Sequence, residues 1–388
     1  MTRRLYAYAF FEDFILVYPV YALLFAAHGL SPGEISTLLV IWSVTAFVVE
    51  IPSGVWADTF SRRRLLALSP LVVGAGFALW TFAPSYPAFA LGFVLWGAGG
   101  AMRSGTFQAL AYEELARVGA KGSYARVMGR TQVASTLAVT CASMLAAPVL
   151  AAGGYLALGV ASVAATAVTA LLGLSLPGHD RPEAGETDAG PDEEDDEPSM
   201  RAVLRTGLAQ IRHVPAVRQA VILLAAVWGF TSIDEYLPLL AQDTGVSVPQ
   251  AALLVAAITV AESVGGWLAG RGAALVRPLL VLAALSLAAG ALTRQPWGFA
   301  LVAVAFGIFA WAHVAAEARL QEHVDDRVRA TVTSVSGLGT EVVVLLVYGS
   351  YGLGSAWLAS WQLFVLAAVP YLVIAAAMGV RGAGGGRR

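Results

Sequence analysis

The sequence predicts an all-α integral membrane protein with twelve transmembrane helices in two pseudo-symmetric six-helix bundles. Of its 388 residues, 58% are hydrophobic and 13% are charged, and the mean hydropathy is +0.71. A soluble domain of this length cannot bury so much apolar surface and still present a solvated exterior. The apolar residues also fall into segments of about 20 residues, the length that a helix needs to cross a bilayer.

The twelve predicted spans follow one another with short breaks rich in turn residues, such as Gly29–Gly33 and Arg294–Pro296. The first bundle comprises residues 1–176, the second comprises residues 216–388, and a linker at 177–215 joins them. Glu12 and Asp13 interrupt the first span where the core of a secretory signal would be uninterrupted, so we interpret it as an uncleaved helix. The spans are expected at 5–27, 34–56, 65–83, 87–110, 127–149, 154–176, 216–240, 249–270, 276–293, 297–318, 330–350 and 356–379.

Positive charges predict the orientation of these spans. With a cytoplasmic N-terminus, all of the 24 Lys and Arg residues except Arg103 and Arg294 lie on the cytoplasmic side. Because positive residues gather in cytoplasmic loops, we expect a multi-pass protein of the inner cell membrane with both termini in the cytoplasm. The linker contains the acidic run Glu193–Glu197 and almost no large apolar residues. This composition favours a solvated, disordered tether over a regulatory or cation-binding segment.

Ionisable residues interrupt several of the spans. An ionisable group in hydrocarbon is costly unless it faces a partner or a water-filled cavity, so such residues usually mark a transport pathway. These charges therefore indicate a protein that moves a solute across a membrane, whereas a receptor or scaffold without transport would leave them unexplained. The candidates for proton coupling are Glu12, Asp13, Glu50, Arg103, Glu262 and Glu341.

A loop motif follows the second predicted span and has a weaker copy after the eighth. The first reads Gly54-Val-Trp-Ala-Asp58-Thr-Phe-Ser-Arg62-Arg63-Arg64, and the second reads Gly266-Trp-Leu-Ala-Gly270-Arg271. Glu50 and Glu262 each stand four residues before the first glycine, so the two halves align there. Together with twelve spans and a central linker, the first motif resembles the G-x-x-x-D-x-x-x-R loop of the major facilitator superfamily of transporters. Ser61 stands where that family often has glycine, and Gly270 replaces the aspartate in the second copy.

This resemblance implies a latch at the cytoplasmic gate, formed by Gly54, Asp58, Arg62 and Arg63. A carboxylate there pairs with arginine and with the positive N-terminal end of a helix from the other bundle. In the alternative interpretation, the arginines are ordinary positive charges of a cytoplasmic loop that only fix the orientation of the helices in the membrane. Arg103 stands roughly where the superfamily has a buried arginine, and the segment around Pro148 resembles a degraded Gly-Pro motif of proton-coupled antiporters.

Glu12, Asp13 and Arg103 are expected at similar depth, on the order of 10 Å in at ~1.5 Å per residue. The resemblance makes the first and fourth helices neighbours. A carboxylate beside a guanidinium stays charged, whereas one in apolar surroundings favours its neutral form, and a proton carrier needs to alternate between the two. The alternative is a static buried ion pair. Which of the two acids pairs with Arg103 stays open.

Other residues offer weaker indications. Aromatic residues suit the lining of a cavity for an apolar substrate, although packing and interfacial belts are common alternatives for them. Whether Asp234 and Glu235 are solvated at the outer end of the seventh span stays open. Small residues four apart, at Gly97, Ala101 and Gly105 and again at Gly266 and Gly270, predict close helix packing. The candidate lining residues are Tyr18, Tyr21, Trp42, Trp228, Phe230 and Trp311.

The expected activity is proton-coupled export of a small, largely apolar compound such as a drug or secondary metabolite. The alternative is proton-coupled transport of a polar nutrient or metabolite, which usually asks for more Asn, Gln and Lys. The expected partners are a small-molecule substrate, protons and the lipid bilayer, with no nucleic acid, and we expect a functional monomer. His313 has no clustered ligands, and phosphate-cradling loops and nucleophile elbows are missing from the sequence, so we expect no metal, no cofactor and no enzymatic activity.

Overall fold

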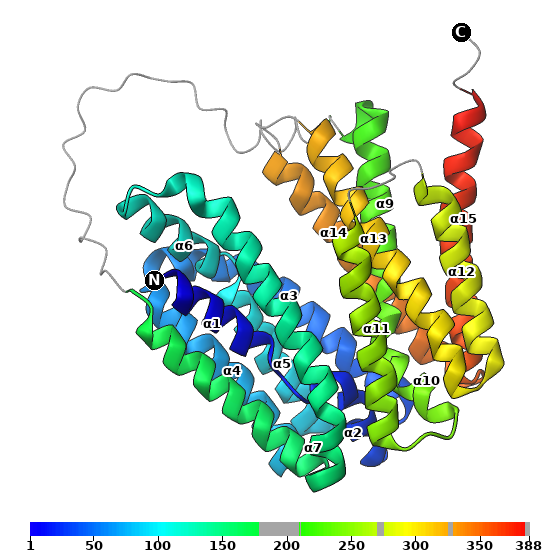
Figure 1. The fold of residues 1–388 in the computed structure, drawn as a ribbon, viewed down its shortest axis with the longest axis horizontal. Coiled ribbons are helices and arrows are strands. Elements are labelled where there is room, and N and C mark those ends of the chain that lie inside the picture. The colour runs from blue at the N-terminus through cyan, green and yellow to red at the C-terminus, as the bar shows by residue number, and fades with distance from the viewer. Residues whose placement is uncertain (178–208, 210, 270–274, 325–328, 385–388) are drawn as a thin grey trace.

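A computed structural model of the chain describes residues 1–177, 209, 211–269, 275–324 and 329–384. Every regular element in this part of the chain is a helix (Figure 1). The first half contains α1 (Thr2–Asp13), η1 (Tyr18–Val20), α2 (Tyr21–Ala27), α3 (Pro32–Thr59), α4 (Arg62–Phe82), α5 (Tyr86–Arg103), α6 (Thr106–Arg117), η2 (Lys121–Ser123) and α7 (Tyr124–Ser175). The second half contains α9 (Pro215–Thr231), η3 (Ser232–Tyr236), α10 (Leu237–Asp243), α11 (Val248–Leu268), α12 (Val276–Thr293), η5 (Pro296–Gly298), α13 (Phe299–His323), α14 (Arg329–Gly354) and α15 (Ser360–Gly384).

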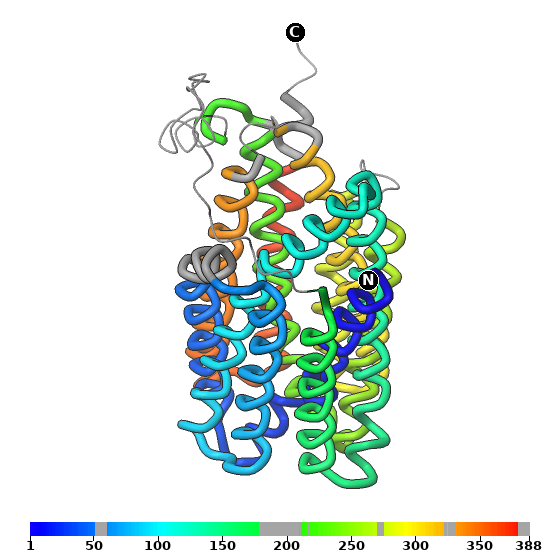
Figure 2. Tube along the Cα trace, turned by 90° about the vertical axis from the view of Figure 1, so that its left-hand side faces the viewer, coloured from blue at the N-terminus to red at the C-terminus, as the bar shows by residue number. Residues whose placement is uncertain are grey.

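The elements fit a twelve-helix membrane bundle, as the sequence predicts. Within the described residues, ten segments are long and apolar enough to cross a membrane. One of them is α7, which merges the fifth and sixth predicted spans across a kink at Gly154, where the backbone has φ 62° and ψ −161°. The fourth predicted span, which α5 carries, is not among the ten. Figure 2 shows the helices of both halves running side by side along one direction.

The two halves repeat the same packing and the same helix starts. In the first half α3 packs on α5, and in the second half α11 packs on α13 at the equivalent place. Reciprocal capping bonds begin both α3 and α11. Ser31 and Glu34 exchange them in the first half, and Ser247 and Gln250 do so in the second. Each of these reciprocal pairs, known as a capping box, satisfies backbone N–H groups that the start of a helix leaves unpaired.

Three predicted spans are not continuous helices, which corrects the expectation for 5–27, 87–110 and 216–240. The first span breaks after Asp13 and resumes as η1 and α2, and the seventh breaks into α9, η3 and α10. Pro19 and Pro238 stand at these breaks, where proline lacks the N–H that helix continuation needs. The fourth span breaks at Gly105, whose φ of +71° strains any residue with a Cβ.

The break in the first span is supported by a side chain from a distant helix. The backbone N–H of Val17 donates to the Ser162 hydroxyl of α7 at 3.1 Å. Unsatisfied backbone groups are not tolerated in lipid, so irregular segments occur where protein or a cavity satisfies them. Ser162 therefore holds the end of the broken helix in a fixed place.

Glycine packing differs in part from the sequence expectation. Gly97 does pack closely, because a Cβ there would lie 3.1 Å from the Trp42 carbonyl oxygen of α3. Gly105 and Gly266 instead face open space. Gly105 provides the backbone conformation of the helix break, and Gly266 does not bring two helices close together. The close approach in the eighth span is at Gly265, where a Cβ would lie 1.9 Å from the carbonyl oxygen of Gly307.

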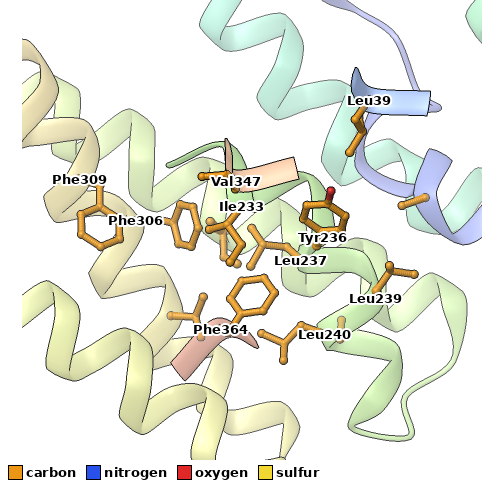
Figure 3. Packing of buried hydrophobic residues seen from close by; sticks show 14 of the residues in the cluster. Leu39, Ile233, Tyr236, Leu237, Leu239, Leu240, Phe306, Phe309, Val347 and Phe364 are labelled. Atoms are coloured by element: carbon orange, nitrogen blue, oxygen red, sulfur yellow. The ribbon is translucent and has the colours of Figure 1, made fainter. Parts of the chain in front are cut away.

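The two halves meet at one end and diverge at the other. We call the end where α7 finishes and α9 begins the linker end, and the opposite end the closed end. At the closed end, a Cβ at Gly352 of α14 would lie 2.7 Å from the Ser36 Cβ of α3. Figure 3 shows Tyr236 of the second half among Ile233 and Leu237, on the side that faces Leu39 of the first half. Toward the linker end the helices of the two halves separate (Figure 1).

Burial along α3 and α14 agrees with this arrangement. On α3, Ile35, Ser36 and Leu39 are buried near the closed end, whereas Phe47 and Val48 are 43% and 57% exposed toward the linker end. On α14, the polar residues Thr333 and Ser334 are exposed at the linker end. Polar side chains seldom face lipid, so these two residues point to a wet space between the halves.

Candidate functional site

An ion pair joins two helix ends inside the first half. Arg103, the last residue of α5, pairs through Nε with Oε1 of Glu12 near the end of α1. The C-terminal end of a helix carries partial negative charge, which favours Arg103 and disfavours the acids Glu12 and Asp13. Arg103 therefore compensates both the carboxylates and the end of α1. The Ser135 hydroxyl of α7 donates to the Ala9 carbonyl oxygen of α1 at 3.3 Å, one turn before Asp13.

A small cavity of about 110 Å³ lies next to this ion pair. Its walls come from α1, η1, α4, α5 and α7, so it lies within the first half. The side chains of Glu12 and Arg103 are 20% and 37% exposed, so the pair keeps access to water. Its lining combines polar and aromatic residues and includes Glu12, Asp13, Ser69, Thr169, Tyr18 and Trp96.

Aromatic rings form a continuous cluster beside the cavity. Tyr18 stacks on Trp96 with ring centroids 4.9 Å apart and planes at 12°. Trp42 of α3 contacts the same Trp96 at 5.1 Å. Tyr21 meets Trp96 edge-on at 6.2 Å. Three of the predicted lining residues thus gather around Trp96, which the sequence reasoning did not select.

The other three predicted lining residues belong to the second half and lie away from this cluster. Trp228 is 49% exposed and its ring lies 4.2 Å from the ring of His313. Phe230 contacts Tyr371 and lines a separate cavity of about 370 Å³ between α9, α14 and α15. Trp311 is 6% exposed and packs in the apolar core. The structure does not bring these three residues into the cluster around Trp96.

Hydrogen bonds connect the two halves near the closed end and at mid-height. The Tyr21 hydroxyl donates to Oε2 of Glu235. The Ser43 hydroxyl donates to Oε2 of Glu341 at 2.7 Å. The hydroxyls of Ser36 and Tyr236 share a third bond at 2.7 Å. Among the described side chains, these three bonds join residues of the first half to residues of the second.

The acids of the second half have a different environment from those of the first. Asp234 and Glu235 lie in η3, are half-buried, and interact electrostatically with each other and with Glu262 of α11. None of the ion pairs in the described part of the chain includes them. The sequence left open whether Asp234 and Glu235 are solvated, and the structure turns them inward. An acidic pair shortly before a proline, as in the first span, was a signal that they resemble Glu12 and Asp13.

The residues of the predicted latch are only partly described. Gly54 and Asp58 lie on the last turns of α3, and their side chains fall outside the described residues. Arg62 begins α4 and pairs with Glu113 of α6, a contact within the first half. Glu50 accepts a hydrogen bond of 2.8 Å from Ser104, the residue after Arg103. Arg63 is half-buried at the linker end.

Within the described residues, His, Cys, Asp and Glu side chains form no group of three or more that could hold a metal ion.

Comparison with known proteins places this geometry in a family. The family model of the Major Facilitator Superfamily matches residues 5–348. The chain belongs to the major facilitator superfamily. It is thus a multi-pass integral membrane protein and a secondary transporter of this superfamily. No curated protein matches the chain at the level of sequence.

Solved structures of superfamily transporters share the fold. A variant of the nucleoside transporter NupG superposes with a TM-score of 0.77 at 12% identity, covering 98% of this chain and 99% of its own. A bacterial homologue of the human lysosomal transporter Spinster, inward-facing and unoccupied, gives 0.70 at 17% identity and covers 96% and 93%. A D-xylose–proton symporter gives 0.66 at 16% identity and covers 97% and 95%. At these identities the similarity shows the superfamily fold alone.

Proposed function

We propose that this chain is a proton-coupled transporter that exports a small, largely apolar compound. The observation that carries the proposal is the ion pair of Glu12 and Arg103 at two helix breaks, beside both a polar cavity and the cluster around Trp96. Broken helices in transporters place binding groups at the bilayer midplane. The site thus combines a titratable group with an aromatic surface.

Proton coupling rests on an excess of acid around Arg103. The guanidinium carries one positive charge, whereas Glu12 and Asp13 together carry up to two negative charges. One acid can therefore stay paired while the other gains and loses a proton. Glu12 holds the ion pair with Arg103, which favours Asp13 as the acid that titrates.

The substrate class follows from the aromatic cluster. Tyr18, Trp42 and Trp96 present adjoining ring surfaces that suit a flat, apolar compound. These three side chains contribute few hydrogen-bonding groups to the surface. Glu262 and Glu341 lie on the opposite half, where they favour a substrate that is neutral or positively charged over an anion.

A second candidate is transport of a polar nutrient or metabolite. Ser69, Thr166 and Thr169 line the cavity beside the ion pair, and their hydroxyls suit a substrate rich in hydroxyl groups. The structural neighbours include a nucleoside transporter and a D-xylose–proton symporter, which are proteins that handle polar solutes. The two candidates predict opposite substrate preferences in one assay.

The test is transport by purified protein in liposomes with an imposed pH gradient. A panel of flat lipophilic amines, flat neutral aromatics, nucleosides and pentoses is offered, with empty liposomes as the control. Export of the proposed kind appears as gradient-driven movement of an aromatic compound opposite to the proton. Movement of a nucleoside or pentose together with the proton would instead establish the second candidate, and transport that ignores the gradient would refute proton coupling.

Localisation and gating complete the proposal. The charge distribution supports an inner-membrane protein with its linker end in the cytoplasm. The proposal takes a monomer as the functional unit. In that orientation the described state is closed to the outside. The cytoplasmic gate then contains Gly54, Asp58, Arg62 and Arg63. The two halves diverge toward this end in the described state, so the latch would form in the opposite state, which is closed to the cytoplasm.

A further inference from the structure

Tyr21 and Glu235 form the bridge between the halves that is best fixed on both sides. Tyr21 is 3% exposed, and its ring contacts Phe25, Trp80 and Phe93 as well as Trp96. Four rings therefore hold its hydroxyl in one position. Glu235 is fixed by η3 of the second half, and it accepts the hydrogen bond from that hydroxyl. The bond can exist only while the closed end is closed.

The other groups around Glu235 are acidic or phenolic. Asp234 precedes it and Tyr236 follows it in η3, and Glu262 of α11 and Tyr348 of α14 interact with it electrostatically. Asp234 and Glu262 repel a negative charge on Glu235. Among the described interactions of Glu235, the Tyr21 hydroxyl is the hydrogen bond that stabilises that charge.

We propose that Glu235 takes up a proton when the closed end opens and that the Tyr21 hydrogen bond expels this proton when it closes again. The inference deepens the proton-coupled function and rests on it for its role in transport. It adds a second proton-handling residue, on the half opposite to Glu12, Asp13 and Arg103. The conformational response itself can be measured without transport.

The physical argument is one of linkage between closure and charge. A hydrogen bond to a charged carboxylate is roughly twice as strong as one between neutral groups. Closure therefore stabilises charged Glu235 more than protonated Glu235. Because coupling is reciprocal, protonation of Glu235 must favour opening. Opening removes Tyr21 and leaves Glu235 beside Asp234 and Glu262, which favours uptake of a proton.

A neutral bridge at the same boundary supplies a matched control. Ser36 and Tyr236 share a bond of 2.7 Å between two hydroxyls, one residue away from Glu235. Loss of this bond weakens closure without removing a group that titrates near neutral pH. Ser43 and Glu341 form the other carboxylate bridge, so part of the pH response is expected to remain when Glu235 is neutralised.

The experiment follows the width of the closed end in lipid nanodiscs without substrate. Cys141 is the only cysteine of the chain, so Cys141→Ser provides a clean background. Spin labels on Ala27→Cys and Gln242→Cys, exposed positions on α2 and α10, report the distance between the halves. Distance distributions are recorded between pH 8 and pH 5 for the parent protein and for Tyr21→Phe, Glu235→Gln and Ser36→Ala.

We expect the open fraction of the parent protein to rise several-fold on acidification. Tyr21→Phe and Glu235→Gln should be more open at pH 8 and should lose at least about half of the pH response, as the loss of a charge-assisted bond requires. Ser36→Ala should be more open at every pH and should keep the full response. Tyr21→Phe removes a single oxygen atom, so this variant tests the inference even if Glu235→Gln fails to insert into the membrane.

Two results would overturn the inference. One is a parent-like pH response in both Tyr21→Phe and Glu235→Gln. The other is an equal loss of response in Ser36→Ala, which would make the effect merely structural. Failure of the proposed function looks different, because transport in liposomes would then ignore the pH gradient while the distance response stayed intact.

Discussion

Glu12 of the first half is compensated within that half, whereas Glu235 and Glu341 of the second half are compensated across the boundary. Glu12 pairs with Arg103, and this ion pair does not depend on the position of the other half. Glu235 and Glu341 instead accept hydrogen bonds from Tyr21 and Ser43 of the first half. Charge in the first half is therefore set locally, and charge in the second half is set by the conformation of the whole molecule.

This difference assigns different tasks to the two halves. A locally compensated acid can exchange a proton with little motion of the protein, as a carrier must. An acid stabilised only by its partner across the boundary changes its environment whenever the halves rock. A ligand or proton shifts a conformational equilibrium only by its differential affinity for the two states. The second half provides that difference, and the first half provides the permanent site.

Neutralising the acids of the first half should produce the largest effect. Glu12→Gln or Asp13→Asn, whichever removes the carrier, should abolish gradient-driven uphill transport, a loss of about tenfold or more, or at least about 1.4 kcal/mol. Downhill substrate exchange should survive, because exchange needs no net change of protonation. Uptake and exchange in liposomes with and without a pH gradient measure both quantities.

Glu262→Gln, measured in the same transport assay, is the comparison variant from the second half. If both first-half variants keep full proton-driven transport, the permanent proton site is not at Glu12 or Asp13. It would then have to be sought at Glu50, Glu262 or Glu341, and a site at Glu262 or Glu341 would reverse the contrast between the halves.

The loop motif gives the second contrast between the halves. Asp58→Asn should insert normally and lose most transport, because the opposite state loses a charge-assisted contact of about 1.5–3 kcal/mol. The second half has Gly270 in the equivalent place. Gly270→Asp should therefore change transport little. Normal turnover by well-inserted Asp58→Asn would exclude the latch.

Helix class, most span positions and the pairing of Arg103 with one of two acids could be predicted, because each follows from the intolerance of lipid for unpaired polar groups. Long apolar segments must be helices, and a buried arginine must find an acid. The helix breaks at Phe14 and Gly105 could not be placed, since a broken span has the same hydropathy as a continuous one. The support that Ser162 gives to Val17 depends on folding across many residues.

The bridges between the halves were also beyond the sequence. Tyr21 was selected only as an aromatic residue, and Glu235 was left open between water and interior. Their contact depends on how the two halves sit in this conformation, which the composition of the helices does not determine. Side chains that lie close in one state of a transporter separate in another.

Charge removal should affect stability with opposite signs in the two halves. Arg103→Ala leaves Glu12 and Asp13 without their cation, and we expect a loss of about 1–3 kcal/mol, below the range for fully buried pairs because the arginine is 37% exposed. Glu262→Gln removes a charge that repels Glu235, so thermal stability should stay unchanged or rise. Thermal unfolding in detergent measures both, with Arg103→Lys as the charge-conserving control. Equal destabilisation by Arg103→Ala and Glu262→Gln would contradict local compensation.

Neighbouring glycines of α11 test how tightly the second half packs. A Cβ at Gly265 would collide with the backbone of Gly307, so Gly265→Ala should cost about 1–3 kcal/mol. Gly266 faces open space, and Gly266→Ala should be neutral or slightly stabilising, since alanine favours helix by up to about 1 kcal/mol. Gly97→Ala in the first half should fall between the two, because its Cβ would meet α3 at 3.1 Å. A larger loss at Gly266 than at Gly265 would show that α11 packs in another register.

Deletion of residues 185–197 should have the smallest effect. This stretch includes the acidic run Glu193–Glu197 and lies outside the described residues. If the halves exchange information only through their shared boundary, the linker needs no more than enough length to join Ser175 to Pro215. Transport and the pH response of the closed end should then both stay near those of the intact protein. A variant of full length with the acidic run replaced by Gly and Ser separates charge from length. Severe loss of transport in that variant, at normal protein level, would show that the acidic run acts on one of the halves and that their charges are not set by the boundary alone.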